Sequence, residues 1–270
     1  MTTFGFIGSG NMASAIVRGM VTAGTPPQDV IVTDAYAAKA AALADELGVR
    51  FLASNAELVN AADYVVPAVK PQMLGPVLTG LTGEFADRGP VVVSIAAGQP
   101  ISRLEGWLPE GIAVIRVMPN VNAQIGEGMA AVAGNAAATP EQVETVLALF
   151  RSVGRAIEVA EKDMSAFSAV AGAGPALTYD FIDALARGAL RHGIPKDLAV
   201  EIAAQTVLGS ARLVLERAAD GITPATLTDT VTSPGGTTIA GLVEAEDAGF
   251  TPAVVKFVDG VVARDRELGA

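Results

Sequence analysis

A glycine-rich turn near the start of the chain has the residue types needed to bind a dinucleotide. The apolar run Phe4–Ile7 predicts a strand, and apolar residues at helical spacing follow the turn. Between them stands Gly8-Ser9-Gly10-Asn11-Met12-Ala13, a G-x-G-x-x-A pattern in the strand–turn–helix context where it is informative. Gly8 permits the tight turn, Gly10 leaves room for a pyrophosphate, and Ala13 lets helix and strand pack closely. The N–H groups of the helix start would then bind the phosphates; the alternative is a tight turn that binds nothing.

An acidic residue at the end of the second expected strand bears on the choice of cofactor. Val30–Thr33 predicts that strand, and Asp34 follows it. A carboxylate there can accept hydrogen bonds from the adenosine ribose hydroxyls of NAD, whereas it would repel the 2′-phosphate of NADP. The alternative is an ordinary acidic strand end. Because Ala35 rather than an arginine comes next, the sequence favours NADH, although Lys39 is close enough to keep NADPH open.

A second bend, in the last quarter of the chain, has the residue types to bind an anion through its backbone. The stretch Val231-Thr232-Ser233-Pro234-Gly235-Gly236-Thr237-Thr238 places two glycines after a proline, then two hydroxyls and an apolar helix. Backbone N–H groups converge at such a bend and can bind a carboxylate or phosphate without a basic side chain. An acidic protein could hold an anionic substrate in this way; the alternative is a helix-start loop that binds nothing.

Charge and composition exclude several classes of function. The net charge is −11 and no basic run is present, which argues against nucleic-acid binding. With no cysteine and a single histidine, His192, the chain lacks the residues for a zinc site, thiolate catalysis or disulfides, and suits a cytoplasmic protein. His192 stands where a helix is expected to stop before a glycine. Chemistry that depends on histidine is therefore not expected.

Membrane insertion is not expected either, although hydrophobic residues make up 51% of the chain. The charge-free stretch Met164–Tyr179 contains two glycines and a proline and is too short to span a bilayer. It predicts a helix buried on all sides, in a core or against another subunit. No secretory signal is expected, because the glycine motif begins at once.

The expected elements change character near residue 160. Up to that point strands alternate with helices, which predicts a doubly wound parallel sheet over residues 1–160. Expected strands include the apolar centre of Asp63–Lys70, and Val91–Ile95, Ala113–Met118 and Met129–Ala133; expected helix caps are Ser54–Glu57, Ser102–Glu105, Thr139–Gln142 and the closing Gly48. From Glu161 onward no strand is expected, and about five helices fill residues 161–270.

Two stretches that follow strands are candidate cofactor contacts. Lys70, which Pro71 keeps out of helical geometry, comes at the carboxyl end of a buried parallel strand, where open α/β sheets bind ligands. Its backbone or its ammonium would face the cofactor. After Val91–Ile95, the small residues Ala96-Ala97-Gly98 leave room for a flat group, so Ala97 is a further candidate contact.

Together these residues resemble the pyrroline-5-carboxylate reductase family, whose members make proline. The resemblance covers essentially the whole chain, and its last motif is highly specific. The motifs are Phe6-Ile7-Gly8-Ser9-Gly10-Asn11-Met12, Ala68-Val69-Lys70-Pro71-Gln72, Arg116-Val117-Met118-Pro119-Asn120, Gly172-Ala173-Gly174-Pro175-Ala176, Ala203-Ala204-Gln205-Thr206-Val207 and Val231 to Thr238.

The resemblance implies a Rossmann-type dinucleotide-binding domain followed by an all-helical dimerisation domain. Two subunits would interlock through the helices, with further assembly of dimers common in the family. The active site would lie where the cofactor of one subunit meets the helical domain of its partner. Met164–Tyr179 is then a subunit interface.

The resemblance also assigns roles to residues. Asn55 and the turn Ala68-Val69-Lys70 would contact the dinucleotide, and Glu161 would approach the bound ring. Ser233, Gly235, Gly236, Thr237 and Thr238 would hold the substrate carboxylate. The implied reaction is hydride transfer from NAD(P)H to C5 of the cyclic imine 1-pyrroline-5-carboxylate, which gives L-proline. Thr238 would donate a hydrogen bond to the ring nitrogen, directly or through water, while the protein supplies orientation and a dry cavity.

The chain departs from the family pattern in places. The family usually has Ser-Gly-Ser-Gly-Pro-Ala-Tyr where this chain has Ala171-Gly172-Ala173-Gly174-Pro175-Ala176-Leu177, so three polar groups are lost. Ser165 stands in place of a common aspartate, Ser168 in place of a threonine, and Val121-Asn122 in place of Thr-Pro. Fold and dimer are expected to survive, and the pocket is expected to be more apolar.

Three alternatives remain open. The first is a reductase of the same architecture that acts on another cyclic imino acid, such as the six-membered homologue. A β-hydroxyacid dehydrogenase shares the two-domain plan but uses a lysine within its long interdomain helix, whereas here Lys162 stands only at the start and the next is Lys196. A non-catalytic dinucleotide-binding homologue is the third.

Overall fold

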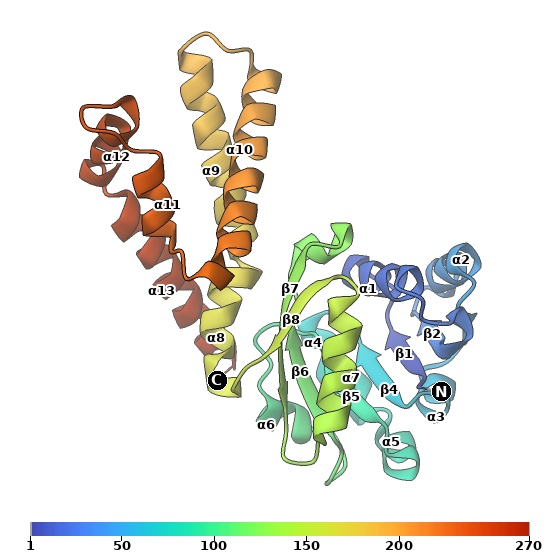
Figure 1. The fold of residues 1–270 in the computed structure, drawn as a ribbon. Coiled ribbons are helices and arrows are strands. Elements are labelled where there is room, and N and C mark those ends of the chain that lie inside the picture. Colours follow the sequence, from blue (N-terminus) through green and yellow to red (C-terminus); the bar gives the residue numbers. More distant parts are fainter. Residues whose placement is uncertain (1, 270) are drawn as a thin grey trace. The chain divides into compact units, whose positions relative to one another are not determined.

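The computed structural model describes residues 2–269, and the chain divides into two compact units (Figure 1). A sheet unit comprises the residues up to Ala173 together with those from Gly260 onward, and a helical unit comprises Gly174–Asp259. The helical unit is therefore an insertion between two segments of the sheet unit.

Eight strands form one sheet in the order β3-β2-β1-β4-β5-β6-β7-β8. Their bounds are β1 Phe4–Ile7, β2 Val30–Thr33, β3 Arg50–Phe51, β4 Tyr64–Pro67, β5 Val91–Ser94, β6 Val114–Met118, β7 Gly128–Gly134 and β8 Gly154–Glu158. Strands β1 to β6 are parallel, which confirms the doubly wound sheet expected from the alternation of strands and helices. The carboxyl ends of these six strands therefore meet at one edge, called the carboxyl edge below.

The other edge of the sheet departs from the all-parallel expectation. Strand β7 runs antiparallel to β6, and β8 runs parallel to β7. Only the short 3₁₀ helix η2 (Val121–Ile125) connects β6 to β7, whereas a parallel return needs a crossover of about a dozen residues or more. Strands β3 and β8 were not expected, because β3 has two residues and β8 buries only Ala156, so neither shows a strand pattern.

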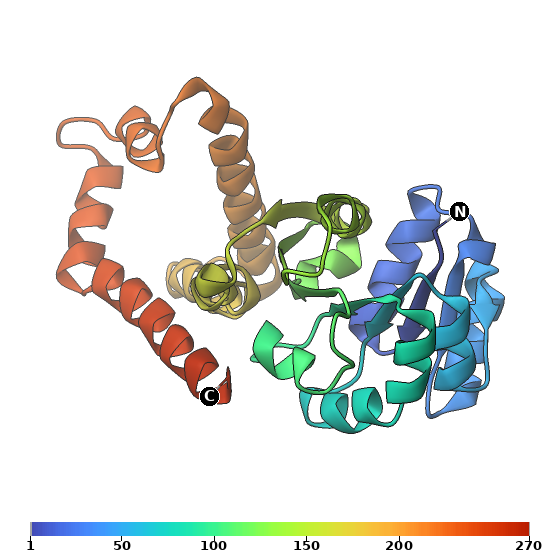
Figure 2. The ribbon, with the colours of Figure 1, turned by 90° about the horizontal axis from the view of Figure 1, so that it is seen from below.

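Helices cover both faces of the sheet (Figures 1 and 2). The helices are α1 Asn11–Thr22, α2 Ala37–Leu47, α3 Asn55–Ala61, α4 Pro71–Thr79, α5 Thr82–Arg88, α6 Ile101–Glu105, α7 Pro140–Arg151 and α8 Met164–Phe167. Apolar residues of α1, α2 and α7 pack with Phe4 and Phe6 of β1 on one face. Those of α3 to α6 pack with Ile7 on the other. Because β1 is buried on both faces, its carboxyl end is held in a fixed position.

Most of the expected helix ends are confirmed, and one is wrong. Thr139 and Gln142 form a reciprocal capping box on α7, Ser54 accepts the N–H of Glu57, and α2 ends at the left-handed Gly48. The capping box expected at Ser102–Glu105 is not formed, because α6 already begins at Ile101 and Pro100 offers no side-chain cap. Glu161 takes that role from a distance: its Oε1 accepts the N–H of Ile101 at 2.6 Å.

The helical unit consists of α9 Gly174–Arg191, α10 Lys196–Arg217, α11 Pro224–Thr230, α12 Thr237–Asp247 and the first half of α13 Phe250–Gly269. Helices α9 and α10 pack side by side (Figure 1) around a small buried cluster of Ala186, Ala199 and Ala203. Large apolar side chains such as Leu185, Leu208 and Leu215 stay exposed. Apolar surface of this extent is typical of helices that pack against another subunit.

One helix among the described residues, spanning Lys196–Asp220, is long and apolar enough to cross a membrane by length and composition alone. Charged residues such as Glu201 and Arg212 interrupt it, so it is not a charge-free stretch. Within the chain, 11% of its most apolar window is buried. These two properties are weak evidence for a membrane span, since a helix at a subunit interface shares them.

The segment Met164–Tyr179, expected as one helix buried in a core or against another subunit, is not one continuous α-helix. It runs through α8, the π-helical turn Ser168–Gly172 and the start of α9, and Val170 is 66% exposed. The amide of Asn120 donates to Ala171 O at 3.0 Å, and its Oδ1 accepts the N–H of Met129 at 3.1 Å. Asn120, from the Met-Pro-Asn motif, therefore ties the π-helical turn to the sheet.

Candidate active site

The Gly8–Gly10 turn occupies the centre of the carboxyl edge. Gly8 N donates to Thr33 O at 2.8 Å, and Ala68 N donates to Ile7 O at 2.8 Å, so the turn lies between the ends of β2 and β4. Gly8 has φ +104, and a Cβ there would stand 2.6 Å from Ala68 O. Glycine is required at this position both for the backbone angle and for the close approach.

The start of α1 fits an anionic dinucleotide. Gly10 is the N-cap, with no side-chain cap, and the first turn of the helix contains no acidic residue. A Cβ on Gly10 would meet nothing within 4 Å, so the space in front of the helix start is open. The first helical bond is Ser14 N to Gly10 O, which leaves the preceding N–H groups to face that space. Asn11 and Met12 form the first residues of α1, and the arrangement fits a pyrophosphate.

Asp34 lies at the end of β2 and binds the glycine turn directly. Its Oδ2 accepts the N–H of Ser9 at 2.7 Å and the Ser9 hydroxyl at 2.8 Å, and its Oδ1 accepts the N–H of Tyr36 at 2.9 Å. Burial raises the pKa of this carboxyl, but the bonds from Tyr36 and Ser9 and the nearby Lys39 ammonium outweigh it, so the pKa lies below its ordinary value. Asp34 is therefore ionised at neutral pH.

The Ser9–Asp34 link is a feature that sequence reasoning did not identify. Ser9 was selected only as part of the motif, yet its side chain is buried and bound to the acid. The sequence offered one indication of this link, namely a serine between two glycines and an acid at the end of β2. Since a carboxylate has about four acceptor positions, three bonds leave Asp34 one position for a ribose hydroxyl.

The Asp34 pKa predicts a pH-dependent contribution to stability. A folded-state pKa below the unfolded value of 3.8 stabilises the protein above that value, and the contribution is lost as the pH falls through the folded pKa. Asp34→Asn is therefore expected to lower the free energy of unfolding at neutral pH. Urea unfolding of the wild type and of Asp34→Asn, between neutral pH and about pH 3, measures the difference between their free energies of unfolding. This difference should decrease as the pH falls. A difference in free energy of unfolding that does not change with pH would contradict the ionised state assigned to Asp34.

The remaining predicted cofactor contacts also lie at the carboxyl edge. Ala68, Val69 and Lys70 follow β4, and Lys70 is the extended N-cap of α4 with Pro71 at the first helical position, as expected. Asn55 is the first residue of α3, and Ala97 follows β5, exposed between buried neighbours. The sheet therefore brings all eleven predicted cofactor residues to one edge, namely Gly8, Ser9, Gly10, Asn11, Met12, Asp34, Asn55, Ala68, Val69, Lys70 and Ala97.

Glu161, the one predicted substrate residue in the sheet unit, has partners of its own. It begins the 3₁₀ helix η3 (Glu161–Asp163), and its Oε1 accepts the N–H of Ile101 at 2.6 Å and lies 3.4 Å from Arg116 Nη1. The Arg116 side chain is 8% exposed and that of Glu161 36%, so the pair is partly buried. One carboxylate oxygen of Glu161 is thus engaged in holding the start of α6.

The second bend lies in the helical unit and has the geometry expected of it. Gly236 N donates to Ser233 O at 2.9 Å, and Gly235 has φ +69. Gly236 is the N-cap of α12 without a side-chain cap, and the first helical bond is Ala240 N to Gly236 O. The N–H groups at the start of α12 are therefore open to an anion. Thr237 and Thr238 are exposed within the chain.

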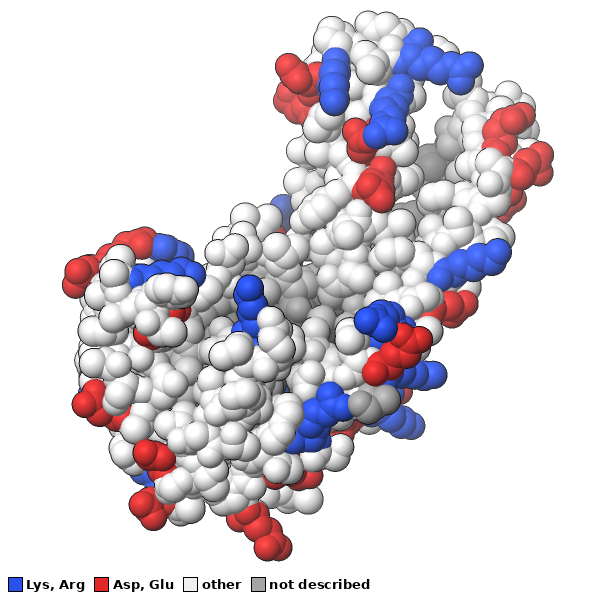
Figure 3. Space-filling view, turned by 180° about the vertical axis from the view of Figure 1, so that it is seen from behind, with Lys and Arg blue, Asp and Glu red and all other residues white. Residues whose placement is uncertain are grey.

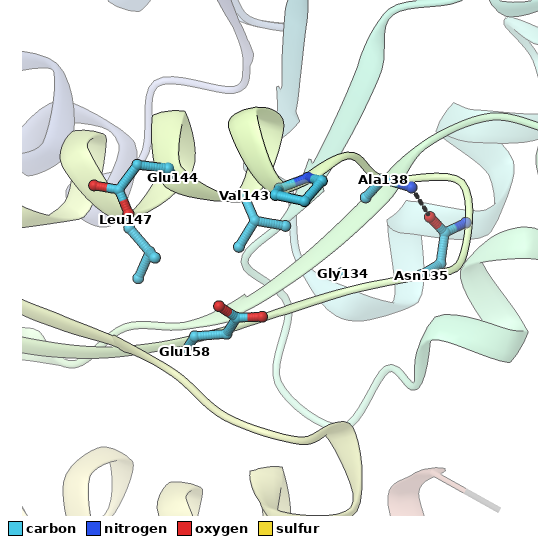
Figure 4. A pocket seen from close by; sticks show the side chains of 8 residues that line it. Gly134, Asn135, Ala138, Val143, Glu144, Leu147 and Glu158 are labelled. Carbon is cyan, nitrogen blue, oxygen red and sulfur yellow. Dashed lines mark hydrogen bonds between the residues drawn. The ribbon is translucent and has the colours of Figure 1, made fainter.

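A small cavity lies elsewhere (Figure 4). It measures about 210 Å³ and is lined by residues of α7 and of the ends of β7 and β8, including Glu144 and Glu158. Because Gly134 pairs with Ile115 near the start of β6, this cavity lies at the edge opposite the glycine turn. Asn135 Oδ1 accepts the N–H of Ala138 at 3.0 Å and closes the loop beside it. This cavity therefore lies outside the candidate active site.

Surface charge agrees with a small-molecule site. On the face drawn in Figure 3, Lys and Arg side chains of the described residues form small groups that lie near acidic ones. Several are paired, as Arg212 is with Glu216 and Arg187 with Asp183. This face therefore carries no continuous basic patch of the kind that nucleic acids bind.

Comparison with known proteins assigns both halves of the chain. The family model described as pyrroline-5-carboxylate reductase dimerisation matches residues 161–268. One described as NADP oxidoreductase, coenzyme F420-dependent, matches residues 3–98. Fold and site thus define an NAD(P)-dependent oxidoreductase with a Rossmann-type sheet and a helical dimerisation domain.

Similar proteins narrow the class. The pyrroline-5-carboxylate reductase of Methanosarcina acetivorans is 41% identical over 98% of this chain and 97% of its own length, and that of Escherichia coli is 38% identical over the same shares. A structure of the Coxiella burnetii reductase superposes with a TM-score of 0.94 at 31% identity, covering 100% of this chain and 99% of that one. The Plasmodium falciparum enzyme with NADP bound gives 0.87 at 28% identity, covering 100% and 98%. The chain belongs to the pyrroline-5-carboxylate reductase family.

Proposed function

We propose that this protein reduces the C=N bond of 1-pyrroline-5-carboxylate with NAD(P)H and so forms L-proline. The observation that carries the proposal is a pair of uncapped helix starts, one in each unit, at Gly10 and Gly236. The first suits the dinucleotide and the second suits a small carboxylate, and neither needs a basic side chain. Family membership identifies the ring that carries the carboxylate.

The chain's own residues bind and orient the substrate. The N–H groups at the start of α12 bind the carboxylate, and the exposed Thr238 hydroxyl donates, directly or through water, to the lone pair that the ring nitrogen gains as hydride reaches C5. NAD(P)H, when bound, supplies the hydride that reaches C5. Glu161 approaches the ring with the carboxylate oxygen that does not hold Ile101. Because a protonated cyclic imine is already a strong electrophile, orientation and exclusion of water are the main requirements.

We propose that the protein works in the cytoplasm as a homodimer, which can assemble further. The apolar side chains left exposed on α9 and α10 support a dimer through the helical unit, as does the match to a dimerisation family. Residues 1–160 would then bind the cofactor, and residues 161–270 would supply the dimer interface and the substrate bend. Size-exclusion chromatography with light scattering tests the assembly, and a monomer at micromolar concentration would contradict it.

An absorbance assay tests the reaction directly. Consumption of NADH and NADPH is followed in parallel, with the five-membered imino acid, with its six-membered homologue and without substrate. Rapid oxidation with the five-membered ring alone supports the proposal. Preference for the six-membered ring would identify a related reductase adapted by the Ala171–Leu177 departures. Cofactor binding without turnover on either ring would identify a non-catalytic homologue.

Asp34 predicts a preference for NADH over NADPH. Its carboxylate is ionised and would stand near the 2′ position of the adenosine ribose, where a phosphate would be repelled. Asp34→Asn is expected to raise the NADPH to NADH ratio of kcat/KM about tenfold, or ~1.4 kcal/mol, since it removes one close like charge. Steady-state kinetics with both cofactors measures the ratio.

Asp29→Asn is the matched control for this substitution. Asp29 carries the same charge in η1 (Pro27–Asp29), just before β2, whereas Asp34 follows the strand's end. The control should leave the cofactor ratio unchanged. An unchanged ratio in Asp34→Asn as well would place the 2′ position away from β2.

A further inference from the structure

The last turn of α13 belongs to the sheet unit and packs on the turn that follows β5. A Cβ on Gly98 would stand 3.1 Å from Leu268 Cβ, which is tighter than ordinary contact. Gly98 also has φ +67, a backbone angle that side chains disfavour. Position 98 therefore requires glycine for two reasons, the positive φ and the close approach of Leu268.

Two further contacts hold the same end of α13. Arg103 Nη1 donates to Leu268 O, and its Nη2 donates to Gly269 O, each at 3.1 Å. A guanidinium at the last carbonyls also suits the negative end of the helix dipole. One turn earlier, Ser165 Oγ donates to Asp265 Oδ2 at 2.8 Å. Residues 265–269, named the buttress, are thus fixed from three sides.

The turn under the buttress is buried except at one residue. Ala96, Gly98 and Gln99 are buried, whereas Ala97 between them is exposed. Gln99 Oε1 lies 3.4 Å from Arg103 Nη1, so the same guanidinium touches the turn and the buttress. Removal of the buttress would expose one side of the turn and loosen Ala97.

We propose that the buttress positions Ala97 against the nicotinamide end of the dinucleotide, which makes Leu268 and Arg103 positioning residues for hydride transfer. The inference rests on the proposed cofactor site. With the adenosine end at Asp34 on β2, a dinucleotide that crosses Gly10 on β1 has its nicotinamide half over the ends of β4 and β5, because the strand order is β2-β1-β4-β5. Support of that half from a distant helix end fixes the geometry on which the reaction depends.

The groove beside the buttress contains a built-in reporter. It measures about 830 Å³ and is lined by Leu268, Arg103, Gln99 and Trp107, together with one face of α4. Trp107 is the single tryptophan of the chain. Because Trp107 and Leu268 line the same groove, a shift of the Trp107 emission to longer wavelength in Leu268→Ala would report a more open groove, independently of activity.

Leu268→Ala tests the proposal, because its effect on binding of the whole dinucleotide can be compared with its effect on binding of the ADP-ribose portion alone. Calorimetry measures the dissociation constants of NAD⁺ or NADP⁺, whichever the wild type binds more tightly, and of its ADP-ribose portion, which lacks nicotinamide. The whole dinucleotide should bind about tenfold more weakly, the ADP-ribose portion should bind as before, and the Trp107 emission should shift. Arg103→Met, which removes the donor to both carbonyls, should give the same pattern.

Two controls separate positioning from general stability. Leu268→Met keeps an apolar side chain of similar size and should restore wild-type binding. Glu144→Ala removes an exposed acid that pairs with Arg151 on α7, outside the buttress, and should leave both constants unchanged.

Equal weakening of both ligands, or a shifted emission with neither ligand affected, would overturn the positioning role. Failure of the wild type to bind either ligand would instead overturn the cofactor site on which the inference rests.

Discussion

Gly10→Ala is expected to weaken NAD(P)H binding about 100-fold, or by ~2.7 kcal/mol, in a protein that still folds. The φ of −69° and ψ of 176° at Gly10 are open to alanine, and the added Cβ would meet nothing within 4 Å. The methyl group would therefore collide only with a group bound in front of α1. Fluorescence titration with NADH and NADPH measures the loss, and thermal unfolding checks the fold.

Gly83→Ala is the matched control. Gly83 lies in α5, and its added Cβ would also meet nothing within 4 Å. It should leave cofactor binding intact and stabilise the fold by about 0.5–1 kcal/mol, because alanine loses less backbone entropy in a helix. Wild-type affinity in Gly10→Ala would show that no pyrophosphate lies at the start of α1.

Thr238→Ala is expected to lower kcat about 30- to 100-fold and to change KM less than about threefold. Thr238 is the second residue of α12 and its side chain is exposed. Alanine is a better helix former, so the substitution should not disturb the bend. The N–H groups that bind the carboxylate remain, whereas the donor to the ring nitrogen is lost. Steady-state kinetics with the five-membered imino acid separates the two constants.

Two further threonine variants serve as controls for Thr238→Ala. Thr238→Ser keeps the hydroxyl and should retain most of the turnover. Thr145→Ala removes a hydroxyl that only donates to Glu141 O within α7, and should have no kinetic effect. An unchanged kcat in Thr238→Ala would remove Thr238 from the mechanism and leave the carboxylate role to the backbone of the bend.

The geometry of the candidate cofactor site was predictable because its determinants are local. The turn at Gly8, the open helix start at Gly10 and the acid at the end of β2 each follow from neighbouring residues. The buried apolar runs of β1, β2, β4 and β5 are long enough to identify parallel strands, whose carboxyl ends must meet. The link between Ser9 and Asp34 was not predictable, because it depends on the distance between two strand ends.

The edge of the sheet and the start of α6 show where local patterns fail. Strand β8 buries one residue and β3 has two, so neither carries a pattern, and the antiparallel course of β7 depends on its connection. Ser102 resembles a cap, yet the carboxylate of Glu161 arrives from another part of the chain and caps Ile101 instead. The acceptor that caps a helix therefore depends on which group the tertiary fold places beside its first N–H groups.

By itself, the sequence determined the fold class, the two bends whose backbone can bind anions, and the family, because backbone angles, helix starts and motif spacing are short-range properties. Only the tertiary structure decided which residues hold those bends in place. Glu161 reaches Ile101 across 60 residues, and Arg103 reaches Gly269 across 166. Such pairings depend on the packing of whole elements, and no local pattern encodes them.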